Sequence, residues 1–82
     1  MFRSVQEKYD YNKRRGGLFS SGYCFGVTLY NDYAKSGKPL QKSIRGFVDS
    51  AHQKALEGEE FSKGVMNAYR DMARVRSGKY KF

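Results

Sequence analysis

Apolar residues recur at helical spacing over two consecutive stretches in the second half of the chain. In the first stretch they are separated by 4, 3, 1, 3 and 4 positions, and the second stretch has a closely similar spacing. Positions spaced in this way fall on one stripe of a helix, as expected where one helix face packs against a core. The pattern predicts helices over residues 39–57 and 59–77, with these apolar positions: Leu40, Ile44, Phe47, Val48, Ala51, Ala55; Phe61, Val65, Ala68, Tyr69, Met72, Val75.

Proline and glycine mark the expected ends of these two helices. Pro39 suits a first helical turn, where its missing N–H is not needed. Gly58 and Gly78 follow the expected helix ends, where glycine adopts a left-handed conformation without a steric clash. Because the connection between the helices is so short, we expect an antiparallel helical hairpin over residues 39–77, and this hairpin organises the predicted fold.

Residues 18–37 fit either a helix or a strand. Ser20 can cap a helix, and several large residues then follow at helical spacing, whereas residues 22–30 also alternate as in a strand. The helix is favoured because the helical spacing continues beyond residue 30 and because a lone strand has no partner in the chain. Gly22 and Gly26 each cost about 1 kcal/mol inside a helix, or they let another helix approach closely.

The predicted fold is a single all-α domain over residues 1–82, a small three-helix bundle built on the helical hairpin. Residues 1–17 form a basic arm or a short helix, and residues 78–82 form a basic and aromatic tail. A core in a chain of 82 residues is marginal, and one cysteine allows no internal disulfide. The alternative is an α+β fold with residues 22–30 as a strand; two chains pairing such strands would form a homodimer.

The charge and the composition favour an anionic partner inside a reducing compartment. The formal net charge is +8, from 16 Lys and Arg against 8 Asp and Glu, and a basic balance of this kind favours nucleic acid or the acidic surface of a protein or nucleoprotein complex. The first residues lack an apolar signal region, and no stretch approaches membrane-spanning length. With the lone Cys24, these features predict a cytoplasmic protein without a membrane partner.

Catalytic chemistry has little support in the sequence. His52 is the only histidine, and no Cys, Asp or Glu stands at metal-ligand spacing from it. Motifs for phosphate loops, dinucleotide binding, paired cysteines or zinc hydrolysis are missing from the sequence. We therefore expect a protein that is not an enzyme, with no catalytic residues, no metal and no cofactor.

Basic residues supply the candidate binding site. Residues 9–15 mix tyrosines with cations, a combination that can stack on bases and neutralise phosphates. Spacings of 7 and 4 place three cations of the last helix on one line opposite its apolar stripe, and two cations of the preceding helix can extend it. A solvated helix face is the alternative interpretation. The candidate nucleic-acid-binding residues are Lys13, Arg14, Arg15, Lys42, Arg45, Lys63, Arg70 and Arg74.

The sequence thus predicts a small non-enzymatic protein that binds DNA or RNA through backbone phosphates. The alternative is a protein-interaction inhibitor or adaptor, such as a phage or mobile-element protein that blocks a host nucleic-acid-processing or defence complex. Its grounds are the small size, the missing catalytic chemistry and an aromatic content of seven Tyr and six Phe. The candidate partner-binding residues are Tyr9, Tyr11, Lys79, Tyr80, Lys81 and Phe82.

Overall fold

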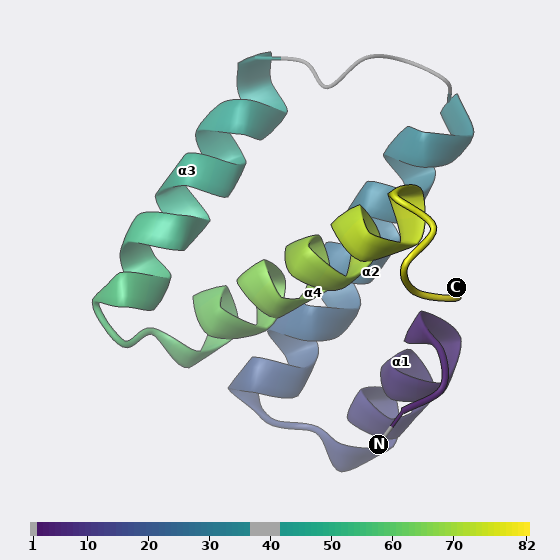
Figure 1. Cartoon of the computed structure of the whole chain (residues 1–82). Coiled ribbons are helices and arrows are strands. Elements are labelled where there is room, and N and C mark those ends of the chain that lie inside the picture. The colour runs from purple at the N-terminus through teal and green to yellow at the C-terminus, as the bar shows by residue number, and fades with distance from the viewer. Residues whose placement is uncertain (1, 37–41) are drawn as a thin grey trace.

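The computed structural model describes residues 2–36 and 42–82, with the side chains of these residues except 33, 34, 36, 42–45 and 47. Within these residues the chain forms four helices and no strand (Figure 1). The helices are α1 (Val5–Arg15), α2 (Leu18–Ser36), α3 (Lys42–Leu56) and α4 (Glu60–Arg76). The all-α prediction is confirmed, and the strand alternative is wrong because residues 22–30 lie inside α2.

The core of the bundle lies between α2 and α4, which share the most extensive interface between helices (Figure 1). Tyr23 and Val27 of α2, Ala68 of α4 and Val5 of α1 form its buried cluster. The predicted hairpin is present as α3 and α4, but α3 approaches α4 over a smaller interface near the connection between them. Residues 39–41 of the predicted hairpin lie outside the described residues. The pair that organises the fold is therefore α2 with α4.

Glycines allow α2 and α4 to approach closely. A Cβ atom at Gly22 would overlap the carbonyl oxygen of Phe61, and a Cβ at Gly64 would overlap the carbonyl oxygen of Phe19. At Gly26 it would lie 2.7 Å from the Cβ of Ala68. The interpretation that Gly22 and Gly26 permit close helix packing is confirmed, and Gly64 supplies the matching small residue on α4.

The N-terminal segment is a helix held to the core by a buried polar cluster. Ser4 caps α1 by accepting a hydrogen bond from the backbone N–H of Glu7 at 3.1 Å. The Lys8 ammonium lies 3.0 Å from the Asp71 carboxylate, which also accepts a hydrogen bond from the Tyr23 hydroxyl at 2.9 Å. This cluster joins α1, α2 and α4, so residues 5–15 are a part of the bundle.

Ser20 is not the cap of α2, contrary to the sequence prediction. The helix begins at Leu18, because Gly16 and Gly17 adopt φ angles of 74° and 93° and turn the chain directly into it. Ser20 is instead buried, and its hydroxyl donates to the side-chain oxygen of Asn12 at 2.8 Å.

The tail folds back on the start of α1. The backbone N–H groups of Val5 and Gln6 donate to the carbonyl oxygens of Lys81 and Phe82 at 2.9 and 2.7 Å. The first N–H groups of a helix have no acceptor within it, so the tail satisfies two of them. The half-buried Tyr80 packs against the core cluster, and its hydroxyl donates to the carbonyl oxygen of Phe2 at 3.4 Å.

Candidate functional site

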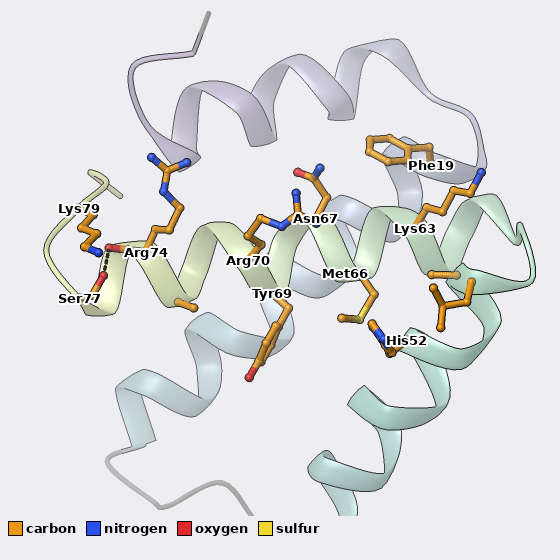
Figure 2. Close-up of a pocket in the computed structure, with 13 residues that line it drawn as sticks. Phe19, His52, Lys63, Met66, Asn67, Tyr69, Arg70, Arg74, Ser77 and Lys79 are labelled. Atoms are coloured by element: carbon orange, nitrogen blue, oxygen red, sulfur yellow. Dashed lines mark hydrogen bonds between the residues drawn. The ribbon is translucent and has the colours of Figure 1, made fainter.

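The outer face of α4, opposite the face that packs on α2, forms the floor of an open groove of about 670 Å³ (Figure 2). The last turns of α3 line one side with His52, Ala55 and Leu56, and Phe19 from the start of α2 also lines it. The end of α3 and the start of α4 are joined by a short connection, so the last turns of α3 lie near the start of α4 and help to form the groove (Figure 1).

Four cations line this groove, namely Lys63, Arg70, Arg74 and Lys79. All four are exposed, and no aspartate or glutamate is among the described residues that line the groove. At 1.5 Å per residue the three helical cations extend over roughly 16 Å of α4. Charges gathered along one groove, without carboxylates between them, produce a positive potential along its length.

Local contacts hold these cations only weakly. The Lys63 ammonium lies 3.1 Å from the Glu60 carboxylate, but both side chains are about half exposed, so the pair contributes little. The Arg74 guanidinium lies 5.3 Å from the ring centroid of Tyr80, within the range of a cation–π contact. The backbone carbonyl of Arg74 accepts from the N–H of Lys79 at 2.9 Å, which ties Lys79 to the end of α4. These side chains are therefore available to a ligand.

The two sides of the groove differ in chemistry. Figure 2 shows Arg70 and Arg74 directed to one side of α4, while Met66 and Tyr69 extend to the other side, where His52 lies. Leu56 is 71% exposed and Tyr69 is 38% exposed, so the second side presents apolar surface to water. The Tyr69 ring packs against the Tyr30 ring at 5.2 Å between centroids, and this contact fixes its orientation. The groove thus has a cationic side, which Phe19 also lines near the start of α4, and an apolar side (Figure 2).

The structure gathers only part of the residue set predicted to bind nucleic acid. Lys63, Arg70 and Arg74 line one groove, as their spacing predicts. The exposed Lys13, Arg14 and Arg15 occupy the last turn of α1 and are not among the residues that line it. The side chains of Lys42 and Arg45 lie outside the described residues.

Asp71 does not interrupt the cationic side of the groove. It is 6% exposed and faces Lys8 and Tyr23 in the core, although its position on α4 is next to that of Arg70. A carboxylate in an amphipathic helix is normally on the solvent face. Its ion pair with a residue of α1 accounts for the exception.

The predicted partner-binding residues divide between the core and the surface. Tyr9 and Tyr80 pack against the core cluster, whereas Tyr11 and Phe82 are 44% and 39% exposed. Lys81 is exposed, and its carbonyl oxygen accepts from α1. Lys79 belongs to the groove rather than to a free tail. Sequence reasoning placed Tyr69 on the core-facing stripe of its helix and assigned none of Leu56, Met66 and Tyr69 to a site. Leu56 and Met66 both lie outside the stripes predicted for their helices, which is the signal that their side chains are not needed in the core.

Two side chains with reactive groups, Cys24 and Tyr23, are partly or fully buried. Burial raises the pKa of the Cys24 thiol, and its sulfur lies 3.7 Å from the carbonyl oxygen of Tyr9, so the thiol stays protonated at neutral pH. Burial, together with the hydrogen bond to Asp71, raises the pKa of Tyr23. In the described part of the chain, no three His, Cys, Asp or Glu side chains are gathered in a way that could hold a metal ion.

Comparison with protein-family models finds no match to this chain. Neither the curated protein sequences nor the solved structures give a match. Across the described helices, none is both long enough and apolar enough to cross a membrane.

Proposed function

We propose that the protein is a non-enzymatic nucleic-acid-binding protein of the cytoplasm that contacts the phosphates of DNA or RNA through the groove on α4. The observation that supports this function is the line of Lys63, Arg70, Arg74 and Lys79, with no described carboxylate lining the same groove. A nucleic acid carries a charge on every nucleotide, so it meets such a line along its whole length. Two of the four cations are arginines, whose planar guanidinium groups bind phosphate oxygens through paired hydrogen bonds.

The proposal predicts a measurable dependence of affinity on salt. Affinity falls as salt rises, and each neutralised phosphate makes the slope of log K against log salt more negative by about 0.9 for duplex DNA and by about 0.7 for a single strand. Four contacts therefore give a slope of about −3 to −4. Fluorescence anisotropy with short labelled DNA and RNA, single-stranded and duplex, across a salt series measures this slope directly.

A matched pair of variants separates the groove from the net charge. Arg70→Gln with Arg74→Gln removes two groove cations. The magnitude of the salt slope should decrease by about 1.5, because two phosphate contacts are lost. Lys35→Gln with Lys54→Gln removes the same charge from exposed residues that do not line the groove, so the slope should stay close to the original value. A third variant, Arg14→Gln with Arg15→Gln, measures the contribution of the end of α1.

Two outcomes would refute the proposal. Equal losses in the groove variant and in the Lys35 and Lys54 variant would mean that total charge, and not the groove, drives binding. No binding to any nucleic acid at low salt would exclude phosphate recognition and would favour the protein-interaction alternative.

A further inference from the structure

The two sides of the groove differ in chemistry, and this difference indicates which form of nucleic acid binds there. The inference rests on the proposed function. On one side Arg70 and Arg74 present charge, and on the other side Tyr69 and Met66 present aromatic and apolar surface (Figure 2). The exposed Leu56 of α3 adds apolar surface to the same groove. We infer that the groove binds single-stranded nucleic acid, with phosphates on the cationic side and unpaired bases against Tyr69 and its apolar neighbours.

A single strand has the same two-sided character as the groove. Its phosphates follow one edge, and its unpaired bases expose flat apolar faces that can stack on aromatic side chains. In a duplex the base faces are stacked inside the helix, and the surface next to the phosphates offers only base edges and sugars. A duplex placed on the cations would leave the apolar side in water or would bring charged phosphates against it, which is unfavourable.

The exposure of the apolar side supports a ligand with an apolar portion. Leu56 is 71% exposed at the end of α3 and Tyr69 is 38% exposed on α4, and both line the groove. Covering apolar surface contributes favourable free energy in proportion to its area. Bases that cover either side chain would gain this free energy in addition to the phosphate contacts.

Tyr69 is suited to stacking because its ring is already held in place. The ring of the buried Tyr30 lies 5.2 Å away at an interplanar angle of 59°, so the contact is tilted. A tilted contact leaves part of the Tyr69 surface uncovered, in agreement with its partial exposure. A side chain that is ordered before binding loses less conformational entropy when a base stacks on it.

The charge pattern favours a nucleic acid over an acidic peptide as the occupant. The cations continue from Lys63 near the start of α4 to Lys79 beyond its end, without a described carboxylate between them in the groove. A polymer with one charge per unit can meet every cation on such a line. An acidic peptide has separated charges and would meet only some of them.

The test compares one labelled oligonucleotide, free and annealed to its complement, at fixed salt. The single strand should bind at least tenfold more tightly than the duplex, because one stacked base contributes about this much. Tyr69→Leu should lower single-strand affinity about tenfold and leave the salt slope unchanged, while Tyr69→Phe should retain the affinity. Phe25→Leu is the matched control, since Phe25 is similarly exposed on α2, also packs against another ring and does not line the groove.

Leu56→Asn is a second variant, and it should weaken single-strand binding severalfold. Because the Leu56 side chain is largely exposed, its replacement leaves the core intact. Duplex binding as tight as single-strand binding, or an equal loss in Phe25→Leu and Tyr69→Leu, would overturn this inference. The proposed function would survive either result if the salt slope still depended on Arg70 and Arg74. Absence of binding to both forms would refute the inference and the proposed function together.

Discussion

Replacing Gly64 with alanine is expected to destabilise the fold, although the same change stabilises most helices. In a helix interior, alanine is favoured over glycine by roughly 0.5–1 kcal/mol because it loses less backbone entropy. Gly64, however, lies where α4 meets α2. An added Cβ would overlap the carbonyl oxygen of Phe19 and would lie 2.7 Å from the backbone nitrogen of Tyr23. Both obstacles are backbone atoms, so no side-chain rotation relieves the clash.

The expected size of the effect follows from the separation that the clash requires. Carbon atoms in contact are normally about 3.5–4.0 Å from their neighbours, so α2 and α4 must move apart by about 1 Å or more. A gap of that size removes a quarter to a half of the dispersion energy of each affected contact, and overpacking of this kind costs about 1–3 kcal/mol. Because 1 kcal/mol corresponds to about 4–8 °C in a domain of this size, Tm should fall by roughly 10 °C.

Gly46→Ala is the matched control, because Gly46 lies in the exposed part of α3 and an added Cβ would have no neighbour within 4 Å. It should raise Tm by a few degrees, as the intrinsic helix preference requires. Thermal unfolding followed by far-UV circular dichroism, with urea denaturation of both variants, gives the comparison. A Gly64→Ala protein as stable as Gly46→Ala would refute the close approach of α2 and α4.

The remaining predictions concern buried polar groups. Asp71→Ala leaves the Lys8 ammonium and the Tyr23 hydroxyl without their shared acceptor, so urea denaturation should show a loss of about 3 kcal/mol. Lys8→Met with Asp71→Leu removes the uncompensated charge and should recover part of this loss, because the Tyr23 hydroxyl still lacks its acceptor. Full stability in Asp71→Ala would contradict the cluster. Burial raises the pKa of Tyr30 from 10.0 to about 12 and raises that of Tyr23 in the same direction. Stability from these neutral phenols is complete below pH 10 and is lost as pH rises through the raised values, so urea midpoints should fall over that alkaline range. The Tyr30 hydroxyl has no hydrogen-bond partner among the described residues, so Tyr30→Phe should be neutral or stabilising by about 1 kcal/mol at pH 7; a large loss of stability would show that the hydroxyl has a partner.

The helices could be predicted from the sequence because their signals are local. Apolar spacing within one helix and glycines just beyond its end depend only on neighbouring residues, and Gly58 and Gly78 do adopt φ angles of 95° and 79°. The choice between strand and helix for residues 22–30 was harder, because a short apolar run fits both periods. The continued helical spacing after residue 30 correctly favoured the helix.

Which helices pack together could not be predicted in the same way. A short connection makes α3 and α4 neighbours, but it does not determine which pair shares the larger interface. That choice depends on small residues meeting across the core, Gly22 and Gly26 on one helix and Gly64 on the other. Glycine in a helix was visible in the sequence, but its partner lies roughly forty residues away, and no periodic pattern joins the two. The burial of Asp71 has the same origin, because its partner Lys8 lies on α1.

The candidate site was predictable only where it lies on one helix. Spacings of 7 and 4 placed Lys63, Arg70 and Arg74 on one face, and all three line the groove. Lys79 and Leu56 reach the same groove from the tail and from α3, so their contribution depends on the tertiary fold. The apolar side of the groove therefore could not be predicted from the sequence, because it depends on how α3 packs against α4.

The core face and the groove face of α4 can be tested independently, because they are formed by different residues of the helix. The core face closes on α2 through small residues, whereas Arg70 and Arg74 stand on the outer face. Arg74 contacts the Tyr80 ring, and an exposed cation–π contact contributes only about 0.5–1 kcal/mol. Neutralising both arginines should therefore leave the domain folded, since surface substitutions usually change stability by less than about 0.5 kcal/mol each. A loss of nucleic-acid binding in that variant, with Tm nearly unchanged, would then be attributable to the groove and not to unfolding.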